Sequence, residues 1–215
     1  MDLTGRYGYF LFDLDGTITD PGVGITNSVM YALEKFNITE KDRSKLYKFI
    51  GPPLRESFSK YYGFSREDSE KAVEYYREYY REKGIFECEL YGDVAQTLRK
   101  LKEAGKKVVL ATSKPEMFAR RILDYFEISE YFDFAAGSTL DGSRDKKADV
   151  IAYALKEAGC FDAKSALMIG DREHDIIGAK ANGMDSVGVL YGYGDRAEHE
   201  NAGATYIIAK ITELV

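Results

Sequence analysis

The chain has 215 residues, of which 45% are hydrophobic and 31% charged, a balance that excludes a disordered or fibrous protein. Thirty Lys and Arg residues against 36 Asp and Glu give a net charge of −6, so there is no basic field to attract a nucleic-acid backbone. The sequence shows no N-terminal targeting pattern and no apolar run of membrane-spanning length. We therefore expect a cytoplasmic monomer that binds neither a nucleic-acid polymer nor a membrane.

Apolar runs rich in Val, Ile, Phe and Tyr recur between segments of helical spacing, which is the pattern of a parallel sheet with crossover helices. Four such runs are candidates for buried strands, at residues 7–12, 108–111, 132–135 and 166–169. The expected fold class is α/β, with a Rossmann-like parallel sheet at its core.

The stretch between the first and second runs is far longer than a normal connection and contains helical patterns without a comparable strand. Within it, Ser65 is a candidate N-cap with the acid Asp68 three residues later, as expected for a helix start. We therefore predict an inserted α-helical domain at 17–90 and an α/β core domain at 1–16 and 91–215.

Several other residue types invite a functional interpretation that we consider weaker than a structural one. Tyrosines 61, 62, 75, 76, 79 and 80 fit helix packing better than a ligand box. Cys88 and Cys160 are too few and too isolated for a disulfide framework or a zinc site. His199 lies in a polar stretch and His174 between Asp171 and Asp175, and we expect both histidines at the surface without a role.

Polar residues end three of the four predicted strands, where parallel α/β sheets bind their ligands. They are Asp13 and Asp15 after the first strand, Thr112 and Ser113 after the second, and Asp171 and Asp175 after the fourth. A single carboxylate at such a place is usually a cap or turn residue. Several together repel one another unless a cation neutralises them, and an all-oxygen site with open positions suits Mg²⁺. The pattern therefore predicts Mg²⁺ and an anionic, phosphate-bearing substrate.

The run Phe12-Asp13-Leu14-Asp15-Gly16-Thr17 resembles the first signature of the haloacid dehalogenase superfamily, whose members are mostly phosphatases. Three further signatures follow in the family's order. Thr112 is similar to the second, Lys147 or Lys146 to the third, and Gly170-Asp171-Arg172-Glu173-His174-Asp175 to the fourth, GDxxxD. The resemblance covers nearly the whole chain.

This resemblance implies a mechanism for the predicted site. Asp13 would attack phosphorus as the nucleophile and form an aspartyl-phosphate. Asp15 would protonate the leaving alcohol and then deprotonate the attacking water. Mg²⁺ would be held by the side chains of Asp13 and Asp171 and by the backbone carbonyl of Asp15, with Asp175 binding directly or through water. Because the dehalogenases that name the superfamily lack the second acid, Asp15 argues against dehalogenation.

The resemblance also implies which residues hold phosphate. The Thr112 hydroxyl, the Ser113 amide and a lysine would bind the phosphoryl oxygens, and Gly16 would form the tight turn beside them. We favour Lys147 over Lys146, because a lysine directly before Ala-Asp-Val-Ile resembles one branch of the family.

The insertion resembles the helical cap of the subfamily that contains phosphoglycolate phosphatases, β-phosphoglucomutases and some 5′-nucleotidases. The segment 51–55, Gly-Pro-Pro-Leu-Arg, is similar to phosphoglycolate phosphatases, and Arg55 is a candidate contact for an anionic leaving group or a surface ion-pair partner. The segments 141–144 and 147–151 are instead similar to the 5′-nucleotidase-like branch. The expected substrate is a small phosphorylated metabolite, with a phosphomutase and a non-catalytic regulator as alternatives.

Overall fold

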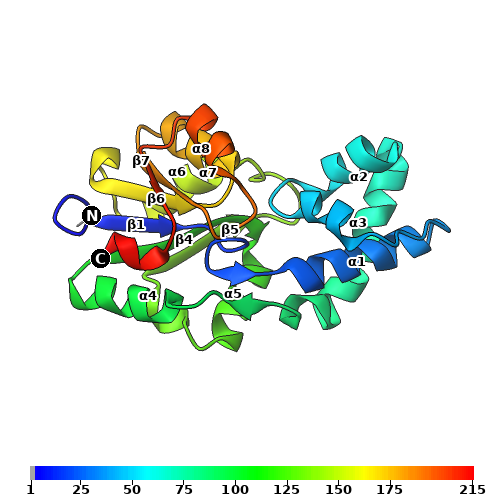
Figure 1. Cartoon of the computed structure of the whole chain (residues 1–215), viewed down its shortest axis with the longest axis horizontal. Coiled ribbons are helices and arrows are strands. Elements are labelled where there is room, and N and C mark those ends of the chain that lie inside the picture. The colour runs from blue at the N-terminus through cyan, green and yellow to red at the C-terminus, as the bar shows by residue number, and fades with distance from the viewer. Residues whose placement is uncertain (1–2) are drawn as a thin grey trace. The chain divides into compact units, whose positions relative to one another are not determined.

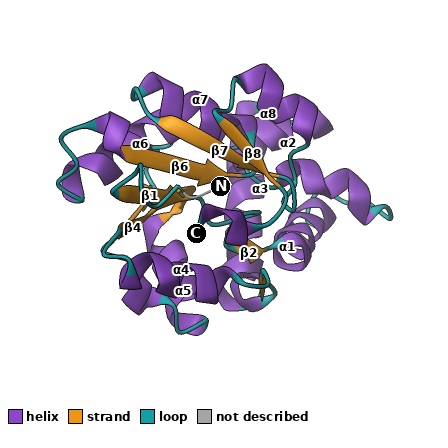
Figure 2. Ribbon diagram, turned by 60° about the vertical axis from the view of Figure 1, so that its left-hand side comes forward, coloured by secondary structure: helices purple, strands orange, loops and turns teal. Residues whose placement is uncertain are grey.

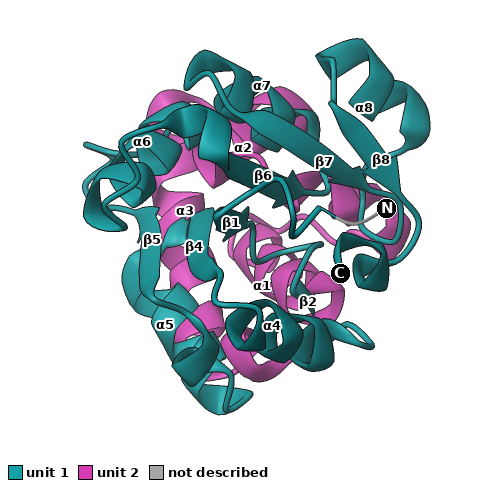
Figure 3. Cartoon of the chain, turned by 90° about the vertical axis from the view of Figure 1, so that its left-hand side faces the viewer, with its two compact units in different colours: residues 1–20, 90–215 teal, residues 21–89 magenta. Residues whose placement is uncertain are grey.

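The computed structural model describes residues 3–215. Met1 and Asp2, the first residues of the predicted core domain, lie outside the described residues. The chain forms two compact units, 1–20 with 90–215 and 21–89 (Figure 3). Residues 17–20 and residue 90, which sequence reasoning assigned to the insertion, belong to the first unit. No helix within residues 3–215 combines the length and the apolar composition that crossing a bilayer requires.

The first unit is built on a six-stranded sheet in the order β5-β4-β1-β6-β7-β8 (Figure 1). All its strand pairs are parallel. The strands are β1 (Tyr9–Phe12), β4 (Lys107–Pro115), β5 (Phe134–Ser138), β6 (Ala166–Gly170), β7 (Asp185–Val189) and β8 (Tyr206–Ile208). The predicted α/β class with a parallel sheet is therefore confirmed.

Helices cover both faces of this sheet, as Figures 1 and 2 show. They are α4 (Val94–Glu103), α5 (Glu116–Tyr125), α6 (Lys147–Glu157), α7 (Glu173–Ala181) and α8 (Arg196–Ala202). Alternate strand residues such as Leu11, Val109 and Met168 pack with Val150 and Ile151 of α6 in one buried cluster. Because both faces are covered, the strands are apolar throughout, which explains why the sequence shows continuous runs.

Strand order places the chemistry at the centre of the sheet. From β1 the chain adds β4 and then β5 on one side, and afterwards returns to the other side of β1 with β6. The sheet order thus reverses at β1, and a crevice at such a switch point is where open α/β sheets bind ligands. The carboxyl ends of β1, β4 and β6 meet there, because their register pairs Phe12 with Leu110 and with Ile169.

The second unit is helical. It contains α1 (Gly22–Glu34), α2 (Leu54–Tyr62) and α3 (Arg66–Glu82), together with the 3-10 turns Arg43–Phe49 and Gly84–Phe86. The Ser65 hydroxyl caps α3 by accepting the Asp68 N–H at 3.0 Å, as the sequence predicts. Tyr76 and Tyr80 are buried with their rings stacked 5.3 Å apart, so these two tyrosines pack as expected.

Four strands were not predicted from the sequence. The strands β7 and β8 extend the sheet beyond β6, and the short strands β2 (Thr19–Asp20) and β3 (Glu89–Leu90) pair with each other where the chain passes between its two units. Strand β4 is also longer than expected, because it continues past Ala111 through an irregularity in its pairing with β5.

Candidate active site

The loop after β1 presents the first two carboxylates. The Asp13 N–H donates to Ile169 O at 2.9 Å, so the ladder between β1 and β6 fixes the backbone of this residue. The Leu14 carbonyl then accepts the N–H groups of residues 17–19 at 3.2, 2.9 and 2.9 Å, which closes a single tight turn. Asp15 lies at the start of this turn, shortly after the end of β1.

Asp171 follows β6 and is fully buried, with 0% exposure. Two glycines let it approach the chain closely: a Cβ on Gly16 would lie 2.0 Å from Asp171 Oδ2, and one on Gly192 would lie 2.4 Å from Asp171 Cβ. Gly16 also has φ of +81°, a conformation that side chains disfavour. The Tyr193 N–H donates to Asp171 Oδ2 at 2.8 Å and orients the carboxylate.

Asp175 and Lys147 enter the site from two neighbouring helices. Asp175 lies in the first turn of α7, where it accepts the Arg172 N–H at 3.1 Å. Lys147 is the first residue of α6, and its Nζ lies 2.8 Å from Asp13 Oδ1 and 2.6 Å from Asp175 Oδ1. Lys146 is exposed, whereas Lys147 is buried, so Lys147 is the lysine that reaches the carboxylates.

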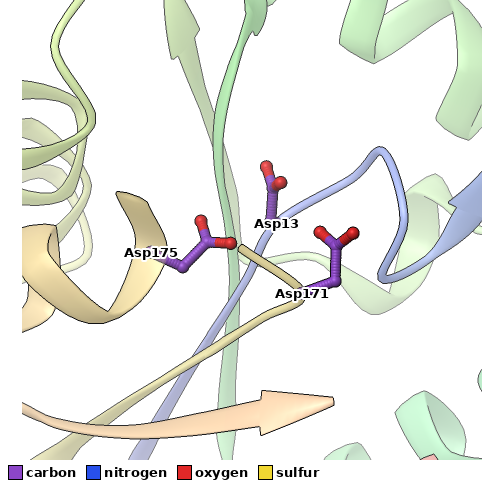
Figure 4. Close-up of side chains that lie close together, drawn as sticks. All are labelled: Asp13, Asp171 and Asp175. Carbon is purple, nitrogen blue, oxygen red and sulfur yellow. The ribbon is translucent and has the colours of Figure 1, made fainter. Parts of the chain in front are cut away.

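Three carboxylates form a group that could hold a metal ion. One oxygen each from Asp13, Asp171 and Asp175 can be chosen so that all three lie within 4.8 Å of one another, and all three residues are buried. Figure 4 shows the three side chains close together, Asp13 on the loop after β1, and Asp171 and Asp175 on the segment that leads from β6 into α7. Within the described chain, Asp171 Oδ1 is buried without a hydrogen-bond partner. A buried carboxylate oxygen without a hydrogen-bond partner, in a group of three carboxylates, fits the ligand set that a divalent cation prefers.

The end of β4 supplies hydroxyl and ammonium groups. The pairing of β4 with β5 shifts register between Ala111 and Pro115, and such irregularities redirect side chains. Thr112 is buried and its Oγ1 accepts the Lys114 N–H at 3.2 Å, while Ser113 is half-buried. Lys114 Nζ in turn lies 2.9 Å from Asp15 Oδ1.

The burial of so many charges shifts their protonation equilibria. Burial raises the pKa of Asp171 well above its usual range, and the neighbouring Asp175 and Asp13 raise it further. Burial also raises the pKa of Asp15, against the opposing effect of Lys114. For Lys147 burial favours the neutral amine, but Asp13 and Asp175 outweigh it and raise the pKa of the ammonium.

The structure brings together most of the residues predicted from the sequence. They are Asp13, Asp15, Gly16, Thr112, Ser113, Lys147, Asp171 and Asp175, all in the first unit. Arg55 belongs to the second unit, where it pairs with Glu70 at 3.7 Å. Lys114 was not predicted, although its place two residues after Thr112 on the same strand could have indicated it.

The expectation for one histidine was wrong. His174 is exposed as predicted, but His199 is fully buried, and its Nε2 lies 3.1 Å from Val189 O. The ring fits because Gly188 has no side chain, and a Cβ there would lie 2.4 Å from His199 Cγ. Because α8 is polar in composition, its sequence gives no indication that His199 faces inward.

Comparison with known proteins places the chain in a family. The model of haloacid dehalogenase-like hydrolases matches residues 10–189. The chain belongs to this family. The sequence-based assignment to the superfamily, and to its hydrolases of phosphoric monoesters, is confirmed.

Three proteins are similar to this haloacid dehalogenase-like hydrolase over nearly its whole length. A 5′-nucleotidase of Pseudomonas aeruginosa is 41% identical over 99% of the chain and 96% of its own length. A protein of Mycobacterium tuberculosis named tyrosine-protein kinase PtkA is 38% identical over 95% of the chain and 70% of its own length. The crystal structure of a predicted phosphatase from Clostridium acetobutylicum, 48% identical, covers 97% of this chain and 96% of its own with a TM-score of 0.93.

Proposed function

We propose that the chain is a Mg²⁺-dependent phosphatase that hydrolyses small phosphate monoesters through a phosphorylated Asp13. The observation that carries this proposal is the buried group of carboxylates with Lys147 at the switch point of the sheet. Such a concentration of buried charge is costly to fold, and it is retained where a reaction needs it.

The charges of the site fit a divalent cation. The carboxylates of Asp13, Asp15, Asp171 and Asp175 face the ammonium groups of Lys114 and Lys147. When all are ionised, two negative charges remain without compensation. Asp13, Asp171, Asp175 and the backbone carbonyl of Asp15 would hold Mg²⁺, and the orphaned Asp171 Oδ1 supports this assignment. When bound, the ion neutralises charge on the phosphoryl oxygens and keeps the carboxylates ionised.

Two displacements at phosphorus then account for hydrolysis. In the first, a carboxylate oxygen of Asp13 bonds to phosphorus, the ester P–O bond breaks, and Asp15 gives its proton to the leaving oxygen. In the second, Asp15 removes a proton from water, the water oxygen bonds to phosphorus, and the P–O bond to Asp13 breaks. Because Asp15 ends each cycle protonated, it can serve as acid again.

Residues around Asp13 would hold the transferring group. The Lys147 ammonium lies 2.8 Å from the Asp13 carboxylate, so it can stabilise the negative charge of a phosphoryl group bonded to Asp13. We assign the Thr112 hydroxyl, the Ser113 amide and the turn at Gly16 to the same task. Positioning of this kind is most of what phosphoryl transfer asks of a protein.

For substrates we propose nucleoside 5′-monophosphates first and phosphoglycolate-like esters second. The similarity to a protein named 5′-nucleotidase over nearly both whole chains supports the first choice. The test is phosphate release from a panel of 5′-nucleotides, phosphoglycolate, sugar phosphates and pyrophosphate, each with Mg²⁺ and with EDTA. We expect Mg²⁺-dependent release with AMP near the top. If no ester releases phosphate, the hydrolase proposal fails, and transfer from ATP to a tyrosine peptide becomes the reaction to measure.

We also propose that the helical unit selects the leaving group, with Arg55 as its anion-binding residue. Arg55 and Arg66 both pair with Glu70, at 3.7 and 3.4 Å, so they form a matched pair of variants. Arg55→Ala should raise KM for phosphoglycolate, whose leaving group carries a carboxylate, and Arg66→Ala should not. Equal KM values for phosphoglycolate in the two variants would show that Arg55 does not bind the leaving group.

A further inference from the structure

The two buried lysines of the site face different carboxylates. Lys147 lies between Asp13 and Asp175, whereas the Nζ of Lys114 lies 2.9 Å from Asp15 Oδ1. The side chains of this second pair are only 5% and 13% exposed. The pair is therefore poorly screened by solvent, and its geometry matters more than that of a surface ion pair.

Lys114 and Asp15 differ in how firmly the backbone holds them. Lys114 belongs to β4 and lies between Ala111 and Pro115, where the pairing of β4 with β5 shifts register, and its N–H donates to Thr112 Oγ1 at 3.2 Å. Asp15 lies in the turn after β1. The next residue, Pro115, pairs with Ser138 of β5, so the strand resumes its pairing directly after Lys114. A group held by a strand is a better reference point than a group on a turn.

We propose that Lys114 is the positioning residue of Asp15: its ammonium fixes the carboxylate where it can exchange a proton with the leaving and attacking oxygens. This inference rests on the proposed function, in which Asp15 is the acid and base. Lys114 acts through Asp15, whereas Lys147 acts on the phosphoryl group. The site thus divides its two buried ammonium groups between proton transfer and phosphoryl binding.

The division predicts a dependence on the leaving group. The alkoxide leaving from AMP needs a proton, whereas p-nitrophenolate scarcely does. Lys114→Met should therefore lower kcat for AMP by about 10²-fold, within the range of general acid catalysis, and lower kcat for p-nitrophenyl phosphate by less than about 10-fold. KM for both should change little. Lys114→Arg, which keeps the charge, should recover part of the AMP activity.

The decisive comparison measures the effect of Lys114→Met in the Asp15→Asn variant, which lacks the proposed acid. In Asp15→Asn, adding Lys114→Met should change kcat for AMP by less than about 2-fold, because neighbouring residues that act as a unit are not additive. The double variant also removes both buried charges together, so it avoids leaving one of them unpaired. Lys100→Met, at an exposed lysine of α4, is the matched control and should behave as wild type with both esters. Circular dichroism establishes that each variant is folded.

The outcomes separate this inference from the proposed function. If Asp15→Asn shows a selective loss with AMP but Lys114→Met does not, the positioning role is wrong and the acid role stands. If Lys114→Met costs as much in the Asp15→Asn background as in wild type, or acts on KM, Lys114 binds substrate directly and the inference is overturned. If Asp15→Asn loses both esters equally, the proposed role of Asp15 fails and the inference fails with it.

Discussion

Replacing Gly16 with alanine should weaken the proposed metal site, although none of its carboxylate residues is substituted. The added Cβ would lie 2.0 Å from Asp171 Oδ2 and 2.4 Å from its Cγ. Ordinary contacts begin at 3.4 Å, so the carboxylate must move by about 1 Å or more. A misplacement of about 1 Å in a catalytic arrangement costs about 10²-fold in rate. The alanine also occupies φ of +81°, which costs about 1 to 2 kcal/mol of stability.

A second glycine separates these two effects. Gly105, after α4, has φ of +70°, but a Cβ there would meet nothing within 4 Å. Gly105→Ala should therefore lose about 1 to 2 kcal/mol of stability and keep wild-type activity. Gly16→Ala should lose more stability than this, because its clash with Asp171 adds to the cost of the positive φ. It should in addition require about 10 to 100 times more Mg²⁺ for half-maximal phosphate release. The assays are thermal unfolding and a Mg²⁺ titration of AMP hydrolysis. If the two variants respond alike to Mg²⁺, the close approach of Gly16 to Asp171 does not support a metal site.

Three further predictions concern the nucleophile, the binding of Mg²⁺ and the ion pairs of Asp133. Asp13→Asn should abolish phosphate release and keep the far-ultraviolet circular dichroism of wild type, whereas Asp145→Asn, at an exposed position, should stay active. Mg²⁺ at about 100 times its dissociation constant should stabilise the wild type by about 2.7 kcal/mol in thermal unfolding, and Asp171→Asn should lose most of this gain. Burial opposes the charge of Asp133, but Lys102, Lys107 and the Val108 N–H outweigh it and lower its pKa to about 2. Because the pKa of Asp133 is lower in the folded than in the unfolded protein, its carboxylate stabilises the fold at pH values above the unfolded pKa of about 3.9. This contribution to stability is lost as the pH falls toward about 2. Asp133→Asn should therefore flatten the loss of stability between about pH 4 and pH 2, and an unchanged acid limb would contradict this ion-pair assignment.

The central strands and the site carboxylates were predictable because buried parallel strands are apolar throughout and end abruptly in polar residues. Phe12 followed by Asp13, and Ile169 followed shortly by Asp171, show this transition clearly. The strands β7 and β8 lack such a contrast, because β7 contains Asp185 and Gly188 and β8 has only three residues. Their place at the side of the sheet is decided by tertiary packing, which local patterns do not contain.

Two side chains show where pattern-based reasoning on the site reaches its limit. The two-residue spacing from Thr112 places Lys114 on the same face only if the strand continues, and a lysine at this position is equally typical of a solvated strand end. Its burial depends on the irregular end of β4 and on the proximity of Asp15. His199 was expected at the surface, and its burial depends on the absence of a side chain at Gly188. In each case the deciding partner lies far away in the sequence.

The stereochemical course at phosphorus distinguishes transfer to Asp13 and then to water from direct attack of water on the ester. Each in-line displacement inverts the configuration of phosphorus, so two displacements restore it. The measurement uses a chiral, oxygen-isotope-labelled thiophosphate monoester hydrolysed in isotopically labelled water, and it reads the configuration of the released thiophosphate. We expect net retention, because two inversions occur. Net inversion would mean that water attacks the ester directly and that Asp13 is not the nucleophile.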